Sequence, residues 1–207
     1  MTIFRSAFRL NCWSLLLVGF LVVLTQISGL QVSDLFFHPF FSPNPNVALL
    51  TRTFQVLCAV PVIVCSFSYG LAKTMQPRPW ESRFILSSAL LTGAFLLNEI
   101  YRIHLYINAW GIPKLGVSFI YAIFVFSYGW FFRLELRYTP YKILLAGLGL
   151  LFFAIGMDAL KLESKILGIL LEGVPKLLSE INIAFYYWYV CKSFIQKGFH
   201  DNYSRYL

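Results

Sequence analysis

The fold is organised around the run Glu172-Gly173-Val174-Pro175-Lys176-Leu177-Leu178-Ser179-Glu180-Ile181-Asn182, which lies within the longer stretch 165–191. Both ends of that stretch are apolar enough to lie in a bilayer. Glu172, Lys176 and Glu180 follow one another at steps of four residues, so a helix would place all three on one face. Charged groups inside a membrane are costly unless polar groups face them. The run therefore predicts a polar site within the membrane.

The same run contains a weakened helical turn. Pro175 lacks the backbone donor that would bond the carbonyl of Leu171, and Gly173 is expected to loosen that turn further. A broken turn exposes backbone carbonyls beside the charges, which is a feature of substrate and ion sites in transporters. The pattern favours a functional site over a purely structural one.

The composition is typical of a chain whose solvent is lipid. Of 207 residues, 58% are hydrophobic and 13% are charged, whereas soluble domains have about 45–50% apolar and about 25% charged residues. Six apolar segments of membrane-spanning length follow one another, at residues 12–30, 48–73, 84–107, 114–132, 141–160 and 165–191. They predict an all-α integral membrane protein, a single domain of residues 1–207 with six transmembrane helices in one bundle and no separate soluble domain.

The basic residues predict the orientation. With six spans, eleven of the seventeen Lys and Arg residues fall on the side of the two termini, namely Arg5, Arg9, Lys73, Arg78, Arg83, Arg133, Arg137, Lys142, Lys192, Lys197 and Arg205. Such an excess marks the cytoplasmic side, so both termini are expected there. The expected location is a bacterial inner (plasma) membrane or a related energy-transducing membrane, with lipid as a partner. Nucleic-acid binding is not predicted, because the sequence contains no basic run with interleaved aromatic residues.

Two further groups of residues have plain structural interpretations. The four cysteines, Cys12, Cys58, Cys65 and Cys191, lie in or beside apolar segments without C-x-x-C or zinc spacing, so they are expected to be small buried residues. The run Phe185-Tyr186-Tyr187-Trp188-Tyr189 near the inner end of the last span is interpreted as an interfacial aromatic belt, with a pigment or quinone surface as the alternative.

Depth along the spans brings polar residues of three helices to a similar level. At 1.5 Å per residue, Glu172, Lys176 and Glu180 lie roughly 10, 15 and 20 Å below the outer end of the last span. Asn98 and Glu99 lie roughly 21–23 Å above the inner end of the third span. The predicted substrate- or ion-binding residues, lining a cavity open to the outer side, are Asn98, Glu99, Arg102, His104, Asp158, Glu172, Lys176 and Glu180.

The leading functional hypothesis is proton-linked movement or sensing of a small ion or solute. Glu99, Glu172 and Glu180 would be the titrating carboxylates, and His104 could relay protons at the mouth of the cavity. An intramembrane enzyme acting on a lipid or isoprenoid is the first alternative, with Arg102 binding the headgroup. The second is a structural or assembly subunit, in which these charges only fix helix packing. Whether the protein is an enzyme stays open.

A metal site is not predicted. Glu99 and His104 are five residues apart, about 140° around a helix, so one metal cannot readily bind both. No cofactor is identified from the sequence. A chain of this size is expected to form a homo-oligomer or to join a larger membrane complex if it is to build a path across the bilayer.

Overall fold

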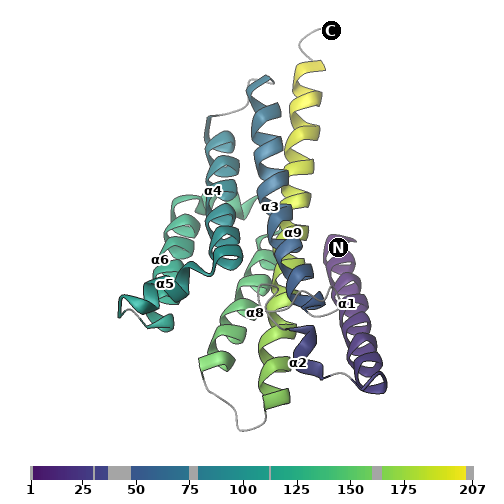
Figure 1. Cartoon of the computed structure of the whole chain (residues 1–207). Coiled ribbons are helices and arrows are strands. Elements are labelled where there is room, and N and C mark those ends of the chain that lie inside the picture. Colours follow the sequence, from purple (N-terminus) through teal and green to yellow (C-terminus); the bar gives the residue numbers. More distant parts are fainter. Residues whose placement is uncertain are drawn as a thin grey trace. The chain divides into compact units, whose positions relative to one another are not determined.

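A computed structural model describes residues 2–29, 31–36, 48–74, 79–111, 113–159 and 165–203. Every regular element in these ranges is an α-helix (Figure 1). In chain order they are α1 (Thr2–Ile27), α2 (Val32–Leu35), α3 (Leu49–Thr74), α4 (Pro79–Tyr101), α5 (Ile103–Ala109), α6 (Lys114–Phe131), α7 (Arg133–Arg137), α8 (Tyr141–Ala159) and α9 (Lys165–Tyr203). The predicted all-α class is confirmed.

Four of the described helices are long and apolar enough to cross a membrane, namely α1, α3, α4 and α8. The chain is therefore a polytopic integral membrane protein. α6 contains a shorter apolar stretch, Gly116–Phe131, and α9 has 39 residues but carries charged side chains along its first half. The count of six spans and the cytoplasmic position of both termini stay predictions.

The chain divides into two compact units. Unit 1 consists of Met1–Leu57 and Lys142–Ile183, and unit 2 consists of Cys58–Tyr141 and Ala184–Leu207. Two of the three boundaries fall well inside helices, so α3 and α9 each contribute one part to each unit; the third separates Tyr141, the first residue of α8, from the rest of that helix. The polar run that begins at Glu172 lies in unit 1.

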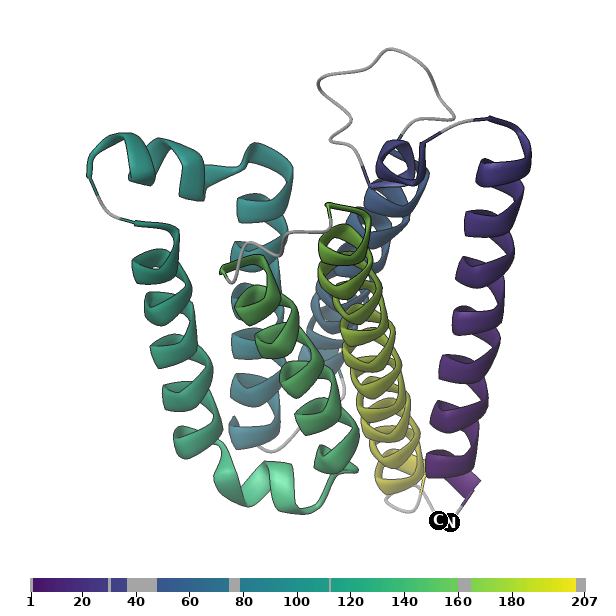
Figure 2. The same cartoon turned by 90° about the horizontal axis from the view of Figure 1, so that it is seen from below.

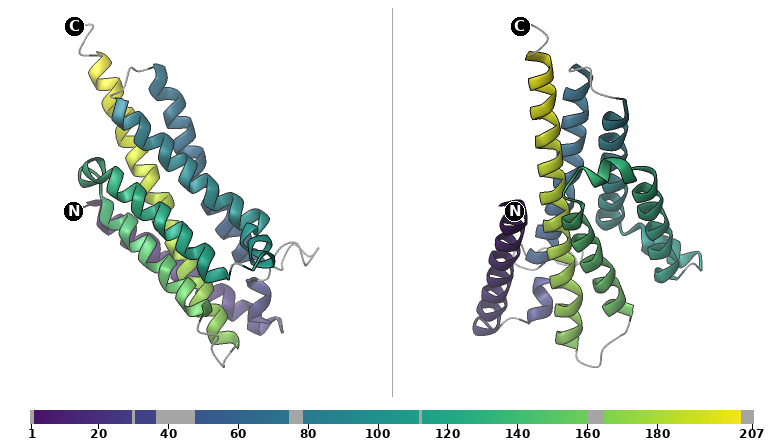
Figure 3. Two further views of the ribbon diagram at one scale, coloured as in Figure 1. Left: turned by 90° about the vertical axis from the view of Figure 1, so that its left-hand side faces the viewer. Right: turned by 180° about the vertical axis from the view of Figure 1, so that it is seen from behind.

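Within unit 1, α8 runs beside the first part of α9 (Figure 3). Gly147 on α8 allows this approach: a Cβ atom there would lie 3.0 Å from the carbonyl oxygen of Ser179 and 3.0 Å from Ile183 Cγ1. Small residues let membrane helices pack closely in this way. The close contact fixes the face of α9 that carries Ser179 against α8.

α1 has few buried residues and ends in a glycine turn. Gly29 has φ +71°, and the amides of Ser28 and Gly29 donate to the carbonyls of Leu24 and Gln26 at 2.9 and 3.1 Å. This is the usual way in which a helix ends at glycine. Trp13, among other large apolar side chains of α1, is 71% exposed, which suits a helix that faces lipid.

Within unit 2, α5 connects the end of α4 to the start of α6, and α7 follows at the far end of α6 (Figure 2). The continuous span expected at residues 84–107 is corrected here, because the helix is interrupted at Arg102. This residue has left-handed backbone angles, φ 51° and ψ 44°. A left-handed non-glycine residue costs about 1–2 kcal/mol, and such strain is concentrated at functional sites. The interruption divides the polar end of the third span between α4 and α5.

Candidate functional site

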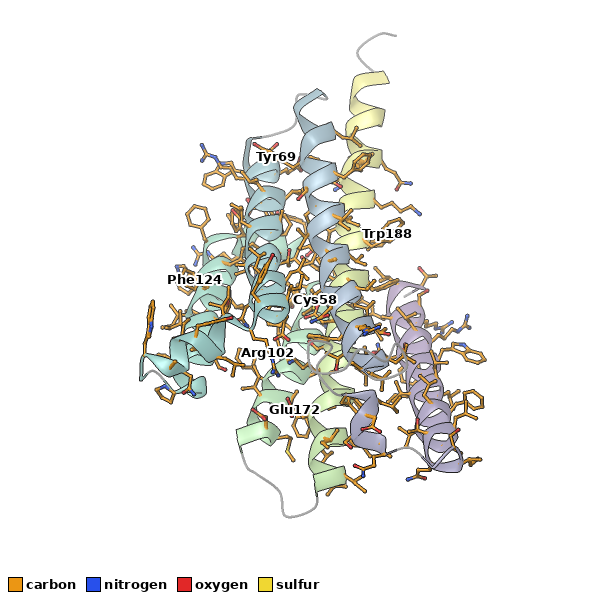
Figure 4. The ribbon with its side chains drawn as sticks, viewed as in Figure 1. Cys58, Tyr69, Arg102, Phe124, Glu172 and Trp188 are labelled. Atoms are coloured by element: carbon orange, nitrogen blue, oxygen red, sulfur yellow. The ribbon has the colours of Figure 1, made fainter. Side chains whose placement is uncertain are left out.

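The polar run lies on the part of α9 that belongs to unit 1. Figure 4 labels Glu172 on this helix. Pro175 lies inside the helix, which continues through it. Glu172 and Lys176 are half-buried, whereas Glu180 is only 2% exposed. The most deeply buried charge of the run is therefore the last one.

Lys176 contacts an aromatic ring from another helix of unit 1. Its Nζ lies 5.0 Å from the centre of the Phe54 ring, which is buried near the start of α3. A cation over a ring face is attracted by the negative potential of that face, and the attraction increases when water is excluded. This contact holds the Lys176 ammonium group against the Phe54 ring, while Lys176 itself is one turn from Glu172 and one turn from Glu180 along α9.

Gly173 has a different role from the one expected. A Cβ atom at this position would collide with the ring of Phe36, the residue that caps the C-terminal end of α2. The glycine therefore makes room for an aromatic side chain from a distant part of unit 1. The sequence shows that this turn has a glycine, but it does not show that the Phe36 ring fills the space beside it.

An amide pair that the sequence pattern did not single out joins α1 to α9. Asn11 Nδ2 donates to Asn182 Oδ1 at 3.0 Å, and Asn182 Nδ2 donates to Asn11 Oδ1 at 2.9 Å. Asn182 also donates to the carbonyl oxygen of Leu178 at 2.7 Å. Asn182 is the last residue of the polar run that begins at Glu172. Its role in joining α9 to α1 depends on Asn11, which lies 171 residues away in the chain.

Ser179, the neighbour of Glu180, is fully buried. Its Oγ has no hydrogen-bond partner among the residues that the structure describes. A buried hydroxyl group can both donate and accept a hydrogen bond, and leaving it without a partner costs free energy. It lies on the turn of α9 that faces Gly147.

The eight predicted site residues are divided between the two units. Unit 1 contains Asp158, Glu172, Lys176 and Glu180, whereas unit 2 contains Asn98, Glu99, Arg102 and His104. Asn98 is buried at 6% exposure, and Glu99 and Asp158 are half-buried. The side chain of His104 lies outside the described part of the structure. The outer cavity shared by all eight residues stays a prediction.

The expected network of buried charges is corrected to a single buried charge. Among the described residues, Glu180 is the only charged side chain that is buried. Glu99, Arg102, Asp158, Glu172 and Lys176 are all half-buried. Long charged side chains can leave their heads near a helix surface while the stems pack, which the spacing alone does not reveal.

The aromatic run of α9 is also corrected in part. Tyr186 and Tyr187 are buried in unit 2, whereas Trp188 and Tyr189 are exposed, and Figure 4 shows Trp188 directed away from α9. The Tyr186 hydroxyl lies 2.9 Å from Thr139 Oγ1. Only the second half of the run therefore resembles an interfacial belt.

Tyr187 belongs to a chain of hydroxyl groups that connects three helices of unit 2. Its hydroxyl donates to that of Tyr128 on α6 at 3.5 Å, and the Tyr128 hydroxyl lies 2.7 Å from Ser88 Oγ on α4. Hydrogen bonds between membrane helices join elements that gain no hydrophobic energy from each other. These tyrosines hold α4, α6 and the second part of α9 together.

The cysteines largely confirm the sequence prediction. Cys58, Cys65 and Cys191 are buried, and Cys12 is half-buried. Cys65 on α3 and Cys191 on α9 lie with their sulfur atoms 3.7 Å apart, as free thiols. They pack as small side chains between two helices of unit 2.

No metal site is found within the described ranges, where no three His, Cys, Asp or Glu side chains gather closely enough to hold an ion. The side chains of the candidate site carry carboxyl, ammonium, amide and hydroxyl groups.

Comparison with known proteins gives a family without an assigned activity. The family described as "Domain of unknown function (DUF8692)" matches residues 9–191, which include all eight predicted site residues and the amide pair. Neither a curated protein nor a solved structure matches the chain. Since the match extends over most of its length, the chain belongs to the DUF8692 family.

Proposed function

We propose that this protein moves or senses a small ion or solute together with a proton, and that Glu180 is the group that takes up and releases the proton. The observation that supports this proposal is the burial of Glu180, at 2% exposure, in a helix of a membrane protein. Intramembrane carboxyl groups are rare and costly, and they commonly form part of proton relays.

The surroundings of Glu180 in unit 1 support the same proposal. Lys176 is one turn away along α9, and Ser179, whose hydroxyl group is buried, is adjacent in the chain. A carboxyl group, an ammonium group and a hydroxyl group can pass a proton or bind a small polar solute between them. Packing alone would be satisfied by small apolar residues at these positions.

Purified protein in lipid vesicles tests the proposal through proton flux. A trapped pH indicator reports the flux after a pH gradient and a membrane potential are imposed. We expect the protein to carry protons faster than empty vesicles, and Glu180→Gln to reduce the rate to that of empty vesicles. The variant keeps the shape of the side chain but removes the titrating group.

The matched control is Glu81→Gln, which removes one half-buried carboxyl group from the first turn of α4 in unit 2. It should leave the flux unchanged. Wild-type flux equal to that of empty vesicles would contradict proton movement. Flux that survives in Glu180→Gln would contradict the role of Glu180, and a structural subunit would show neither flux nor an effect of the substitution.

A further inference from the structure

An open hollow of about 480 Å³ lies in unit 2, where α6 ends and α7 follows. Its lining residues are Gly129, Arg133, Leu134, Leu136, Arg137 and Tyr141. The volume lies within the range of small-molecule sites. Two guanidinium groups, a phenol and two leucines form a wall that is cationic in one part and apolar in another.

The two arginines are arranged to act together. Arg133 and Arg137 are one turn apart on α7, so they lie on the same face. The guanidinium carbon of Arg133 lies 5.1 Å from the centre of the Trp130 ring, which limits the positions that its side chain can take. Glu135 is two residues from each arginine, a spacing at which side chains do not face each other.

Neither guanidinium group is paired with a carboxylate in the part of the chain that the structure describes. A guanidinium group binds phosphate through two parallel hydrogen bonds. Two such groups without carboxylate partners attract an anion. The hollow therefore has the donors that a phosphate group requires.

The position of the hollow along the chain indicates headgroup depth. The apolar stretch Gly116–Phe131 of α6 ends directly before it. Trp130 is 65% exposed and Tyr138 is 90% exposed. Exposed tryptophan and tyrosine beside the end of an apolar helix are typical of the membrane–water interface.

We propose that this hollow binds the phosphate group of an anionic phospholipid. Arg133 and Arg137 hold the phosphate oxygens, the Tyr141 hydroxyl contacts the rest of the headgroup, and Leu134 and Leu136 contact the glycerol region. An anionic headgroup is favoured over a choline headgroup because the quaternary ammonium of choline would be repelled by the two arginines. The proposal does not depend on proton movement through Glu180.

Lipid titration of the purified protein in detergent, followed by native mass spectrometry, tests this assignment. Phosphatidylglycerol is the probe, and phosphatidylcholine and inorganic phosphate are the comparisons. We expect phosphatidylglycerol to bind Arg133→Gln/Arg137→Gln at least about tenfold more weakly than wild type, since one charge-assisted hydrogen bond contributes that much. The affinity of Arg133→Lys/Arg137→Lys for phosphatidylglycerol should lie between those of the wild type and the double Gln variant, because lysine keeps the charge but lacks the planar guanidinium group.

The matched control is Arg5→Gln/Arg9→Gln, which removes two exposed arginines that are also one turn apart, on α1. It should keep wild-type affinity. An equal loss in this control would overturn the proposal in favour of general surface charge. Equal binding of phosphatidylcholine would exclude selection of anionic lipid, and inorganic phosphate binding as tightly as phosphatidylglycerol would assign the hollow to a soluble phosphate compound.

Discussion

Two glycines show how the same residue type takes different roles according to the group that packs against it. Gly173 accommodates the ring of Phe36, and Gly147 accommodates the backbone of α9 at Ser179. Gly149, only two residues from Gly147, has open space where a Cβ atom would stand. The sequence shows only that all three are glycines within helices, and the packing distinguishes them.

Gly147→Ala should destabilise the protein. The added methyl group would press on a backbone oxygen that cannot move without shifting α9, and overpacking of this kind costs about 1–3 kcal/mol. The gain in helix propensity offsets up to about 1 kcal/mol of that cost. Thermal unfolding in detergent measures the effect as a lower Tm.

Gly149→Ala is the control, because it gains the same helix propensity without a clash. Its Tm should equal or exceed that of the wild type. If Gly147→Ala were as stable as Gly149→Ala, the close packing of α8 on α9 would be contradicted.

At the scale of helices, the apolar runs predicted the existence of the main elements better than their limits. The third predicted span continues through residues 102–107 because Ile, Leu and Tyr maintain its hydropathy. The chain nevertheless turns left-handed at Arg102. No glycine or proline marks this position, so no local sequence pattern predicts the left-handed turn.

Partners distant in the sequence account for most of the other differences. The buried half of the aromatic run packs against Thr139 and Tyr128, and Asn182 pairs with Asn11. Composition indicates only that such residues are polar or aromatic within apolar helices. Their burial depends on which helices become neighbours, and a single sequence does not reveal which helices pack together.

The amide pair predicts a measurable coupling between α1 and α9. Asn11→Leu and Asn182→Leu should each lower the free energy of unfolding. The double variant should lower it by less than the sum of the two single decreases. Side-chain hydrogen bonds between membrane helices contribute about 0.6 kcal/mol on average and up to about 1.7 kcal/mol. Because the pair has two such bonds, we expect a coupling of about 1–2 kcal/mol.

Unfolding in denaturant measures the four free energies of this cycle. The control is Asn108→Leu, at an exposed position on α5 in the other unit. Its change in unfolding free energy should simply add to that of Asn11→Leu or Asn182→Leu, without coupling. Strict additivity of Asn11→Leu and Asn182→Leu would show that the pair does not join the two helices.

At the scale of the whole molecule, hydropathy was sufficient to predict an all-α polytopic membrane protein. It was less informative about α9, whose charges reduce its resemblance to a membrane span although it is the longest of the described helices. All of the predicted charged residues except Arg102 lie on helices, yet only Glu180 is buried. Depth can be estimated from residue counts, but the direction in which each side chain points cannot.

Protonation of Glu180 in the folded protein is the central claim, and infrared difference spectroscopy of the protein in lipid bilayers measures it directly. As pH is changed, a carboxyl C=O absorption should appear and disappear reversibly in the wild type and in Glu81→Gln. It should be missing in Glu180→Gln at unchanged helical content. An identical set of carboxyl absorptions in the wild type and in folded Glu180→Gln would contradict the account.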